Sequence, residues 1–276
     1  MANNSELDAA LTPLIEALET MIAVQRYLHP IMIDQLKEKL RLRQEPLVVA
    51  RERLASFDWP EGADAIRSDV DTSCDLALKA ISGFCDVPSD PEGIFMAYRA
   101  LRYAPYSMET LYPAAGLSTA VSQFYLEPDS RRDDTLHKRI KAADDHEDTG
   151  VLHFNNSREE KGGCSIYVPE YYDPDVSYPI VFALHGGSGH GRAFLWTWLR
   201  EARTRGFILV SPTARIDTWS IMKPEVDTEN IDGILGRVRE RWNVDASRML
   251  MTGMSDGGTF PYMSGLASSS PFTHLA

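Results

Sequence analysis

The sequence has little cysteine and no long hydrophobic run. Its three cysteines, Cys74, Cys85 and Cys164, are widely spaced and have no histidine at the spacing of a zinc ligand set. We therefore expect reduced thiols, with neither a disulfide nor a metal site. No stretch of 18 apolar residues occurs, which argues against a membrane span. Residues 1–24 lack a basic start and carry four acidic side chains, unlike a secretory signal. Together these absences predict a cytoplasmic protein.

Positive charge is also scarce. Lysine and arginine number 28 against 40 aspartates and glutamates, a net charge of −12. The first 150 residues hold 16 basic and 26 acidic side chains, and the remaining 126 hold 12 and 14. A chain without a basic stripe is repelled by phosphate backbones, so we expect no nucleic-acid partner. Anionic membrane surfaces are disfavoured for the same reason.

The first part of the chain has a helical pattern. Apolar residues recur at positions i, i+3, i+4 and i+7 through residues 6–28, and similar patterns follow at 31–42 and 47–57 around Pro46, at 63–84, at 92–103 and at 114–126. We predict an all-α accessory region over residues 1–126 that covers a cleft or joins copies into a homo-oligomer. Residues 127–150 are strongly polar and are predicted to be a linker. Their acidic run at 144–148 is rejected as a metal site, because adjacent side chains of a helix point in different directions.

Residues 151–276 have a different organisation, in which strands and helices alternate. A hairpin is predicted where two apolar segments flank Lys161-Gly162-Gly163. After it, we expect strands at 178–184, 206–212 and 248–252, separated by helices at 194–204 and 227–242. This alternation predicts an α/β fold with a parallel sheet covered on both faces. The loops that follow such strands meet at the carboxyl edge of the sheet, where open α/β folds bind ligands.

Two glycine-rich motifs lie at that edge. Gly253-Met254-Ser255-Asp256-Gly257 follows the last predicted strand and has the form Gly-x-Ser-x-Gly. The small residues allow a sharp turn from strand to helix that exposes the hydroxyl of Ser255. The second motif, His185-Gly186-Gly187-Ser188, ends the strand at 178–184. Its backbone N–H groups are suited to stabilising a developing oxyanion.

Residues 151–276 resemble the α/β-hydrolase superfamily, and within it the esterases similar to phospholipase/carboxylesterases or to polyester depolymerases. The resemblance rests on the two motifs and on Trp242-Asn243-Val244-Asp245, which leads into the last strand. It implies a partial α/β-hydrolase sheet after the all-α region, and a serine esterase that uses no cofactor and acts on a small-molecule ester.

The resemblance also implies roles for particular residues. Ser255 is the expected nucleophile of an acyl-enzyme mechanism. The expected oxyanion hole combines the backbone N–H of Asp256 with one from Gly186, Gly187 or Ser188. Trp219 follows the strand at 206–212 and is expected to line the cleft. His185 is expected to support the loop or to line the cleft beside it.

The sequence departs from the superfamily after the nucleophile. In the family, an acid and then a histidine follow the serine. Here Asp256 is the last acidic residue and His274 is the sole downstream histidine, in a segment that reads as the next strand. We therefore expect a C-terminally truncated domain that lacks the triad acid and histidine. Such a fragment is expected to be inactive by itself.

Two other functions stay open. A serine peptidase similar to prolyl oligopeptidase also favours Gly-x-Ser-x-Gly-Gly, but that family places a β-propeller where this chain has helices. The chain could instead be a non-catalytic interaction module with a remnant hydrolase domain. The intact serine, elbow glycines and glycine-rich loop argue against such decay, because a scaffold needs none of them together.

Overall fold

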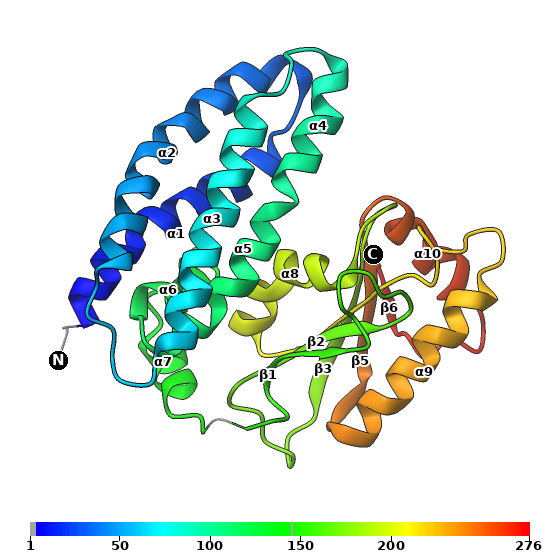
Figure 1. The fold of residues 1–276 in the computed structure, drawn as a ribbon. Helices are drawn as coiled ribbons and strands as arrows, with labels where there is room; N and C mark the ends of the chain where they lie inside the picture. The colour runs from blue at the N-terminus through cyan, green and yellow to red at the C-terminus, as the bar shows by residue number, and fades with distance from the viewer. Residues whose placement is uncertain (1–3, 145) are drawn as a thin grey trace. The chain divides into compact units, whose positions relative to one another are not determined.

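The computed structural model describes residues 4–144 and 146–276 (Figure 1). Residues 1–3, at the start of the predicted all-α region, therefore lie outside the described residues. So does Asp145 of the acidic run at 144–148. The chain divides into two units, residues 1–125 and residues 126–276. We refer to them as the helical unit and the sheet unit.

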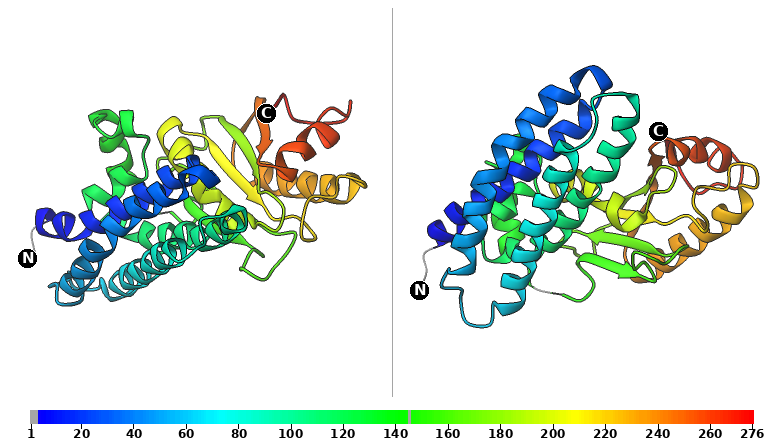
Figure 2. Two further views of the ribbon diagram at one scale, coloured as in Figure 1. Left: turned by 90° about the horizontal axis from the view of Figure 1, so that it is seen from above. Right: turned by 45° about the horizontal axis from the view of Figure 1, so that its top comes forward.

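The helical unit is all-α, as the periodicity predicted. Within it α1, α2 and α3 pack side by side and α5 packs on α3 (Figures 1 and 2). The apolar spacing of the first segment buries Leu7, Leu11, Leu14 and Leu18 along one face of α1. The segments on either side of Pro46 form a single helix. The elements are α1 (Asn4–Arg26), η1 (Pro30–Met32), α2 (Ile33–Ala55), α3 (Asp64–Cys85), α4 (Pro91–Leu101), α5 (Tyr103–Leu111), η2 (Tyr112–Gly116) and α6 (Thr119–Phe124).

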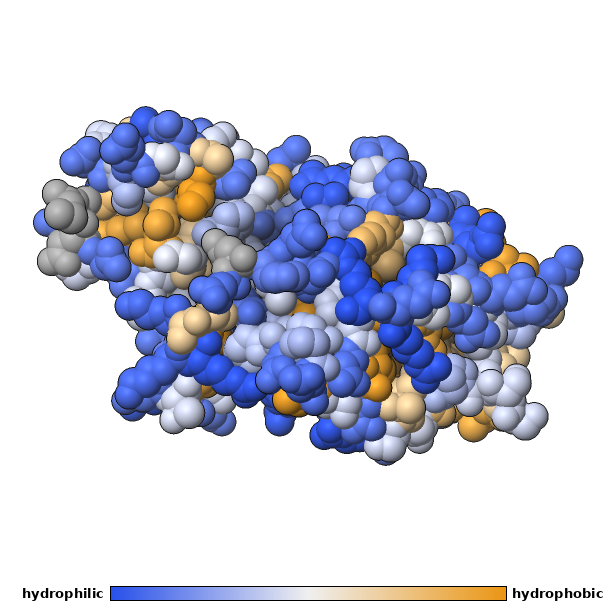
Figure 3. Space-filling model, turned by 90° about the horizontal axis from the view of Figure 1, so that it is seen from below, coloured by the Kyte–Doolittle hydropathy of each residue, from blue (hydrophilic) through white to orange (hydrophobic). Residues whose placement is uncertain are grey.

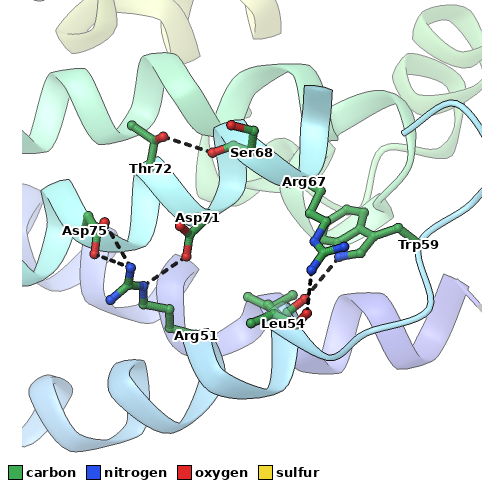
Figure 4. Close-up of polar contacts among 9 residues, drawn as sticks. Arg51, Leu54, Trp59, Arg67, Ser68, Asp71, Thr72 and Asp75 are labelled. Carbon is green, nitrogen blue, oxygen red and sulfur yellow. Dashed lines mark hydrogen bonds and ion pairs between the residues drawn. The ribbon is translucent and has the colours of Figure 1, made fainter. Parts of the chain in front are cut away.

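Polar contacts join α2 and α3 at the surface of this unit. Arg51 of α2 pairs with Asp71 and Asp75 of α3, at N–O distances of 3.0 and 2.9 Å (Figure 4). The indole Nε1 of Trp59 donates to the carbonyl of Leu54 at 3.1 Å, next to the end of α2. These ion pairs are half exposed, so each contributes at most about 1 kcal/mol, and the buried leucines of α1 and α2 supply most of the stability.

The sheet unit contains a six-stranded mixed sheet with the strand order β1-β2-β4-β3-β5-β6. β1 and β2 form the predicted antiparallel hairpin, and β2 runs antiparallel to β4. β4, β3, β5 and β6 are mutually parallel. This confirms the predicted α/β fold. The strands are β1 (Gly150–Phe154), β2 (Cys164–Val168), β3 (Tyr178–Leu184), β4 (Ile208–Pro212), β5 (Val244–Gly253) and β6 (His274–Leu275).

Helices cover both faces of the sheet (Figure 2). α8 (Gly191–Arg205) contacts β2, β3 and β4. α9 (Glu225–Arg241) and Phe260 of α10 (Asp256–Ser264) share a core with Phe182 and Val210 on the other face. Successive residues of a strand point to opposite faces, so the continuous apolar run of β3 is what burial on both sides requires.

Residues 127–150 contain η3 (Pro128–Ser130) and α7 (Asp134–Lys141) and are grouped with the sheet unit. Asp148 pairs with Arg241, and its carbonyl accepts a hydrogen bond from Trp242 Nε1 at 2.8 Å. The segment that was predicted as a linker is thus attached to the end of α9. The face drawn in Figure 3 is mainly hydrophilic, with hydrophobic patches between the polar side chains.

Candidate active site

Ser255 occupies a sharp turn between β5 and α10. Its φ and ψ are 54° and −122°, a backbone conformation that residues other than glycine rarely adopt. The glycines on either side are required by close packing. A Cβ on Gly253 would lie 2.2 Å from the carbonyl oxygen of Gly257, and one on Gly257 would lie 2.3 Å from that of His185. The predicted strand-turn-helix elbow is therefore present, and it leaves the Ser255 side chain exposed.

The loop after β3 lies directly beside this elbow. A Cβ on Gly186 would stand 3.5 Å from the Cβ of Ser255, and one on Gly187 would stand 2.7 Å from Asp256 Oδ2. Ser188 also has a positive φ, 57°. The structure thus brings Gly186 and Gly187 next to Ser255 and Asp256, and Ser188 follows them in the same loop.

The N–H groups of this loop are not equivalent. The N–H of Ser188 donates to the carbonyl of Asp217 at 2.8 Å, so it is already used within the fold. By contrast, the N–H groups of Gly187 and Asp256 have no acceptor among the described residues. Gly187 and Asp256 are therefore better placed than Ser188 to donate to a bound oxyanion.

A side-chain contact ties the loop after β4 to the elbow. Thr218 Oγ1 donates to Asp256 Oδ2 at 2.5 Å, and the Asp256 carboxylate in turn contacts Gly187. The loops that follow β3, β4 and β5 are thereby held against one another. The sequence motifs did not reveal this contact, because Thr218 and Asp256 are separated by 38 residues.

His185 lies under the glycine-rich loop, with both ring nitrogens occupied. Nε2 accepts the backbone N–H of Ala214 at 3.1 Å, so it carries no proton. Nδ1 then carries the proton and donates to the carbonyl of Gly186 at 2.7 Å. The side chain is 1 % exposed, and burial lowers its pKa to about 4. A neutral ring with both nitrogens engaged has no free position from which to take a proton from Ser255.

The pKa of His185 predicts how the stability of the sheet unit depends on pH. The neutral form is favoured in the folded state, so the unfolded chain binds the extra proton between pH 6.5 and about 4. The free energy of unfolding is therefore expected to fall as pH decreases through this window, by up to about 3 kcal/mol from this group. Urea unfolding measured from pH 7 to pH 4 tests this. The His185→Gln variant cannot take up this proton, so its free energy of unfolding should decrease less steeply with falling pH. An equal slope in the variant would assign the pH dependence to other groups.

Trp219 is also buried beneath the loop. Its indole Nε1 donates to the carbonyl of His185 at 2.7 Å, and its ring centroid is 5.1 Å from that of His185 and 5.4 Å from that of Phe260. The side chain is 1 % exposed. Trp219 and His185 therefore support the loop from below, and neither presents the open surface that lining a cleft would require.

A buried carboxylate that the sequence did not single out holds the loop after β4. Asp227, in the first turn of α9, is fully buried. Its two oxygens accept the backbone N–H groups of Arg215 at 3.0 Å and of Ser220 at 2.8 Å. These bonds fix the segment that carries Thr218 and Trp219. The one signal in the sequence was an aspartate at the start of a predicted helix, which is common at exposed helix ends too.

Besides His185, residues 185–276 contain His190 and His274, and neither reaches Ser255 in a usable state. His190 caps α8: Nδ1 accepts the N–H of Arg192 at 3.2 Å and Nε2 donates to the carbonyl of Glu160 at 3.0 Å. Burial lowers its pKa as well. His274 lies on β6 opposite Leu250 of β5. Leu250 precedes Ser255 by five residues, which corresponds to about 16 Å along a strand. The histidine expected of a triad is thus not supplied by His185, His190 or His274.

The described part of the chain contains no group of three or more histidines, cysteines or acids arranged to hold a metal ion. Among its helices, none combines the length and apolar character needed to cross a bilayer.

No protein-family model matches the chain. A bifunctional acetylxylan esterase/xylanase from Neocallimastix patriciarum is 28 % identical over 115 residues, which cover 39 % of this chain and 17 % of that protein. An acetyl xylan esterase structure from Aspergillus awamori has a TM-score of 0.36 at 18 % identity, covering 42 % of this chain and 46 % of that one. The dipeptidyl peptidase 4 structure from Porphyromonas gingivalis has a TM-score of 0.35 at 18 % identity, covering 51 % of this chain and 22 % of that one. Such TM-scores do not distinguish an esterase from a peptidase. The esterase resemblance therefore rests on the bifunctional acetylxylan esterase/xylanase. This chain spans about a sixth of that protein's length.

Proposed function

We propose that the sheet unit is part of a serine hydrolase of carboxylic esters, with Ser255 as the nucleophile. The observation that carries the proposal is the backbone of Ser255, held at φ 54° between β5 and α10. Such strain costs on the order of 1–3 kcal/mol and persists only where the surroundings impose it. Here the packing of Gly253 and Gly257 imposes it, and the exposed hydroxyl is the result. A scaffold would gain nothing from this conformation.

In the proposed reaction, Ser255 Oγ attacks the ester carbonyl and forms a tetrahedral oxyanion. The N–H groups of Asp256 and Gly187 donate to that oxyanion, and each such donor is worth about 2.7 to 4 kcal/mol in the transition state. Collapse of the intermediate breaks the ester bond, releases the alcohol and leaves an acyl group on Ser255. Water then attacks the acyl-enzyme, which breaks the bond to Ser255, releases the carboxylic acid and regenerates the serine hydroxyl.

The proton of the Ser255 hydroxyl must pass to a base during the attack. His185 and His190 have both ring nitrogens engaged, and His274 lies away from the elbow along β5. We therefore propose that the histidine and the acid of the triad are supplied from outside these 276 residues. A carboxylic ester as substrate is supported by the name of the curated relative, which includes an acetylxylan esterase activity.

Binding of an alkyl boronic acid tests the nucleophile and the oxyanion donors without requiring a base. Boron accepts a lone pair of the serine oxygen, the hydroxyl proton passes to solvent, and the tetrahedral adduct mimics the intermediate. We expect the protein to form such an adduct, detected by ¹¹B NMR as tetrahedral boron. Ser255→Ala should abolish it, while Ser269→Ala, which removes an exposed serine of the same unit, should leave it intact. Equal adduct formation by the wild type and Ser255→Ala would refute the role of Ser255.

The helical unit is proposed to assist assembly without taking part in bond making. It exposes large apolar side chains, among them Ile31 at 83 %, Leu42 at 74 % and Phe95 at 74 %. Exposed side chains of this kind favour contacts with other protein surfaces. A homo-oligomer formed through this unit, in the cytoplasm, is the assembly that we propose.

A further inference from the structure

A cavity of about 520 Å³ opens beside the β1–β2 hairpin. Its size lies within the range of about 300 to 1,000 Å³ that small-molecule sites occupy. None of the residues of the serine elbow lines it. Its walls come from the hairpin and from α9, and are formed by His153, Phe154, Asn155, Lys161, Gly162, Gly163, Cys164 and Arg237.

The lining of this cavity is cationic. Lys161 and Arg237 both line it, and none of its lining residues is acidic. Lys161 has one ion pair, at 3.6 Å, with an Asp217 side chain that is 95 % exposed, and such a pair is weak. In the part of the chain that the structure describes, Arg237 has neither an ion pair nor a hydrogen bond. The cavity thus holds a positive charge that the fold itself does not neutralise.

The position of Arg237 follows from the glycine one turn before it on α9. Arg237 Nη1 lies 3.7 Å from where a Cβ on Gly233 would stand, so the guanidinium lies back along the helix. It also comes close enough to the hairpin to act on Cys164. Burial raises the pKa of the Cys164 thiol to about 12, and the charge of Arg237 opposes that rise. Asn230, Gly233 and Arg237 follow one another at three- and four-residue spacing, which places them on one face of α9.

Asn230 adds a hydrogen-bond donor on that face. Its Nδ2 is buried and has no hydrogen-bond partner among the described residues. This atom lies 4.0 Å from where a Cβ on Gly162 would stand, and Gly162 lines the cavity. A buried donor without a partner costs about 1–3 kcal/mol, so Asn230 is an unsatisfied donor behind the cavity wall at Gly162, although Asn230 itself does not line the cavity.

A second cavity, of about 350 Å³ between α2 and α3, shows the contrast. Its arginines are occupied: Arg51 pairs with Asp71 and Asp75, and Arg67 donates to the carbonyl of Ala55 at 2.7 Å (Figure 4). A ligand there would have to displace existing partners. The hairpin cavity requires no such exchange at Arg237.

We propose that the hairpin cavity binds the oxyanion of a small ligand, a carboxylate or a phosphate. The planar guanidinium of Arg237 matches either group with two parallel hydrogen bonds. Lys161 contributes a second charge from the hairpin. The site is independent of Ser255 and of the proposed ester hydrolysis.

Isothermal titration of the whole chain with acetate, acetamide and inorganic phosphate tests this proposal. Acetamide has nearly the shape of acetate without its charge. We expect saturable binding of acetate or of phosphate and none of acetamide. If acetate binds, the site accepts carboxylates; if only phosphate binds, it is a phosphate site. Either result supports the proposal. Absence of saturation with both anions, or binding of acetamide as tight as that of acetate, would overturn it.

Variants of α9 provide the matched control. Arg237→Ala is expected to raise the dissociation constant at least about tenfold, because it removes the bidentate group. Arg239→Ala removes the same charge from another face of the same helix, where Arg239 Nη2 contacts Met249 Sδ at 3.0 Å. It should change the dissociation constant less than about twofold. Equal weakening by both substitutions would show general charge attraction and contradict a built site. Tryptophan fluorescence melts of both variants confirm that they are folded.

Discussion

The purified chain is expected to release p-nitrophenol from p-nitrophenyl acetate no faster than its Ser255→Ala variant. The reason is the state of the three histidines within residues 185–276. His185 and His190 have both ring nitrogens in hydrogen bonds, and His274 is paired opposite Leu250. In a serine hydrolase, loss of the histidine alone lowers kcat by about 10⁶-fold. Turnover that depends on Ser255 should thus fall below the background reaction, measured by absorbance at neutral pH.

Boronic acid binding by the same sample is the control for this result. An inactive chain that still forms the tetrahedral adduct at Ser255 has its nucleophile and oxyanion donors in place and lacks a base. Robust turnover that disappears in Ser255→Ala would contradict the assignment of the histidines. His185→Gln, His190→Gln and His274→Gln would then show which ring accepts the proton.

Local patterns in the sequence sufficed for most of the sheet unit. The hairpin was predicted because apolar segments flank Lys161-Gly162-Gly163, and the structure shows why glycine is needed there. Gly162 has a φ of 74°, and a Cβ on Gly163 would lie 1.8 Å from the carbonyl oxygen of Asn155. The elbow was predicted on the same basis. Both features depend on neighbouring residues, so their chemistry is visible in a short stretch of sequence.

The contacts that hold the site together were beyond such patterns. A buried histidine and a catalytic histidine look alike in a sequence, and only the partner atoms at Gly186 and Ala214 show that His185 supports the loop. Asp227 likewise resembles an exposed helix-start aspartate until its two amide partners are seen. Ala214 is 29 residues from His185, and Arg215 and Ser220 are 12 and 7 residues from Asp227. Residue type alone does not encode such partners.

Pro46 gives a further example from the helical unit. A proline inside a helix removes one hydrogen bond and disturbs the carbonyl four residues earlier. The sequence therefore predicted two helical segments, at 31–42 and 47–57, on either side of Pro46. The structure continues α2 through Pro46. The residue four positions earlier, Leu42, is 74 % exposed, which places this side of α2 at the surface. The buried face of α2, with Leu36, Leu40 and Leu47, compensates for the lost bond.

Gly257→Ala is expected to destabilise the sheet unit by at least about 3 kcal/mol. The added methyl group would lie 2.3 Å from the carbonyl oxygen of His185 and 2.4 Å from that of Leu184. Both are backbone atoms at the end of β3, so α10 and β3 would have to separate by about 1 Å, which close-packed interiors resist. Urea unfolding followed by tryptophan fluorescence measures the effect, because four of the five tryptophans, at positions 196, 198, 219 and 242, belong to the sheet unit.

Gly236→Ala makes the same chemical change in α9, where a Cβ would meet nothing within 4 Å. It should be neutral or stabilise the unit by up to about 1 kcal/mol through helix propensity. The separation caused by Gly257→Ala would also move the elbow away from the glycine-rich loop, and a misplacement of about 1 Å is enough to cost about 10²-fold in catalysis. Boronic acid binding should therefore weaken in Gly257→Ala under conditions where the variant is still folded, and remain unchanged in Gly236→Ala. If the two variants unfolded at the same urea concentration and bound the boronic acid equally, the contact between α10 and β3 would not be what holds Ser255 in its strained conformation.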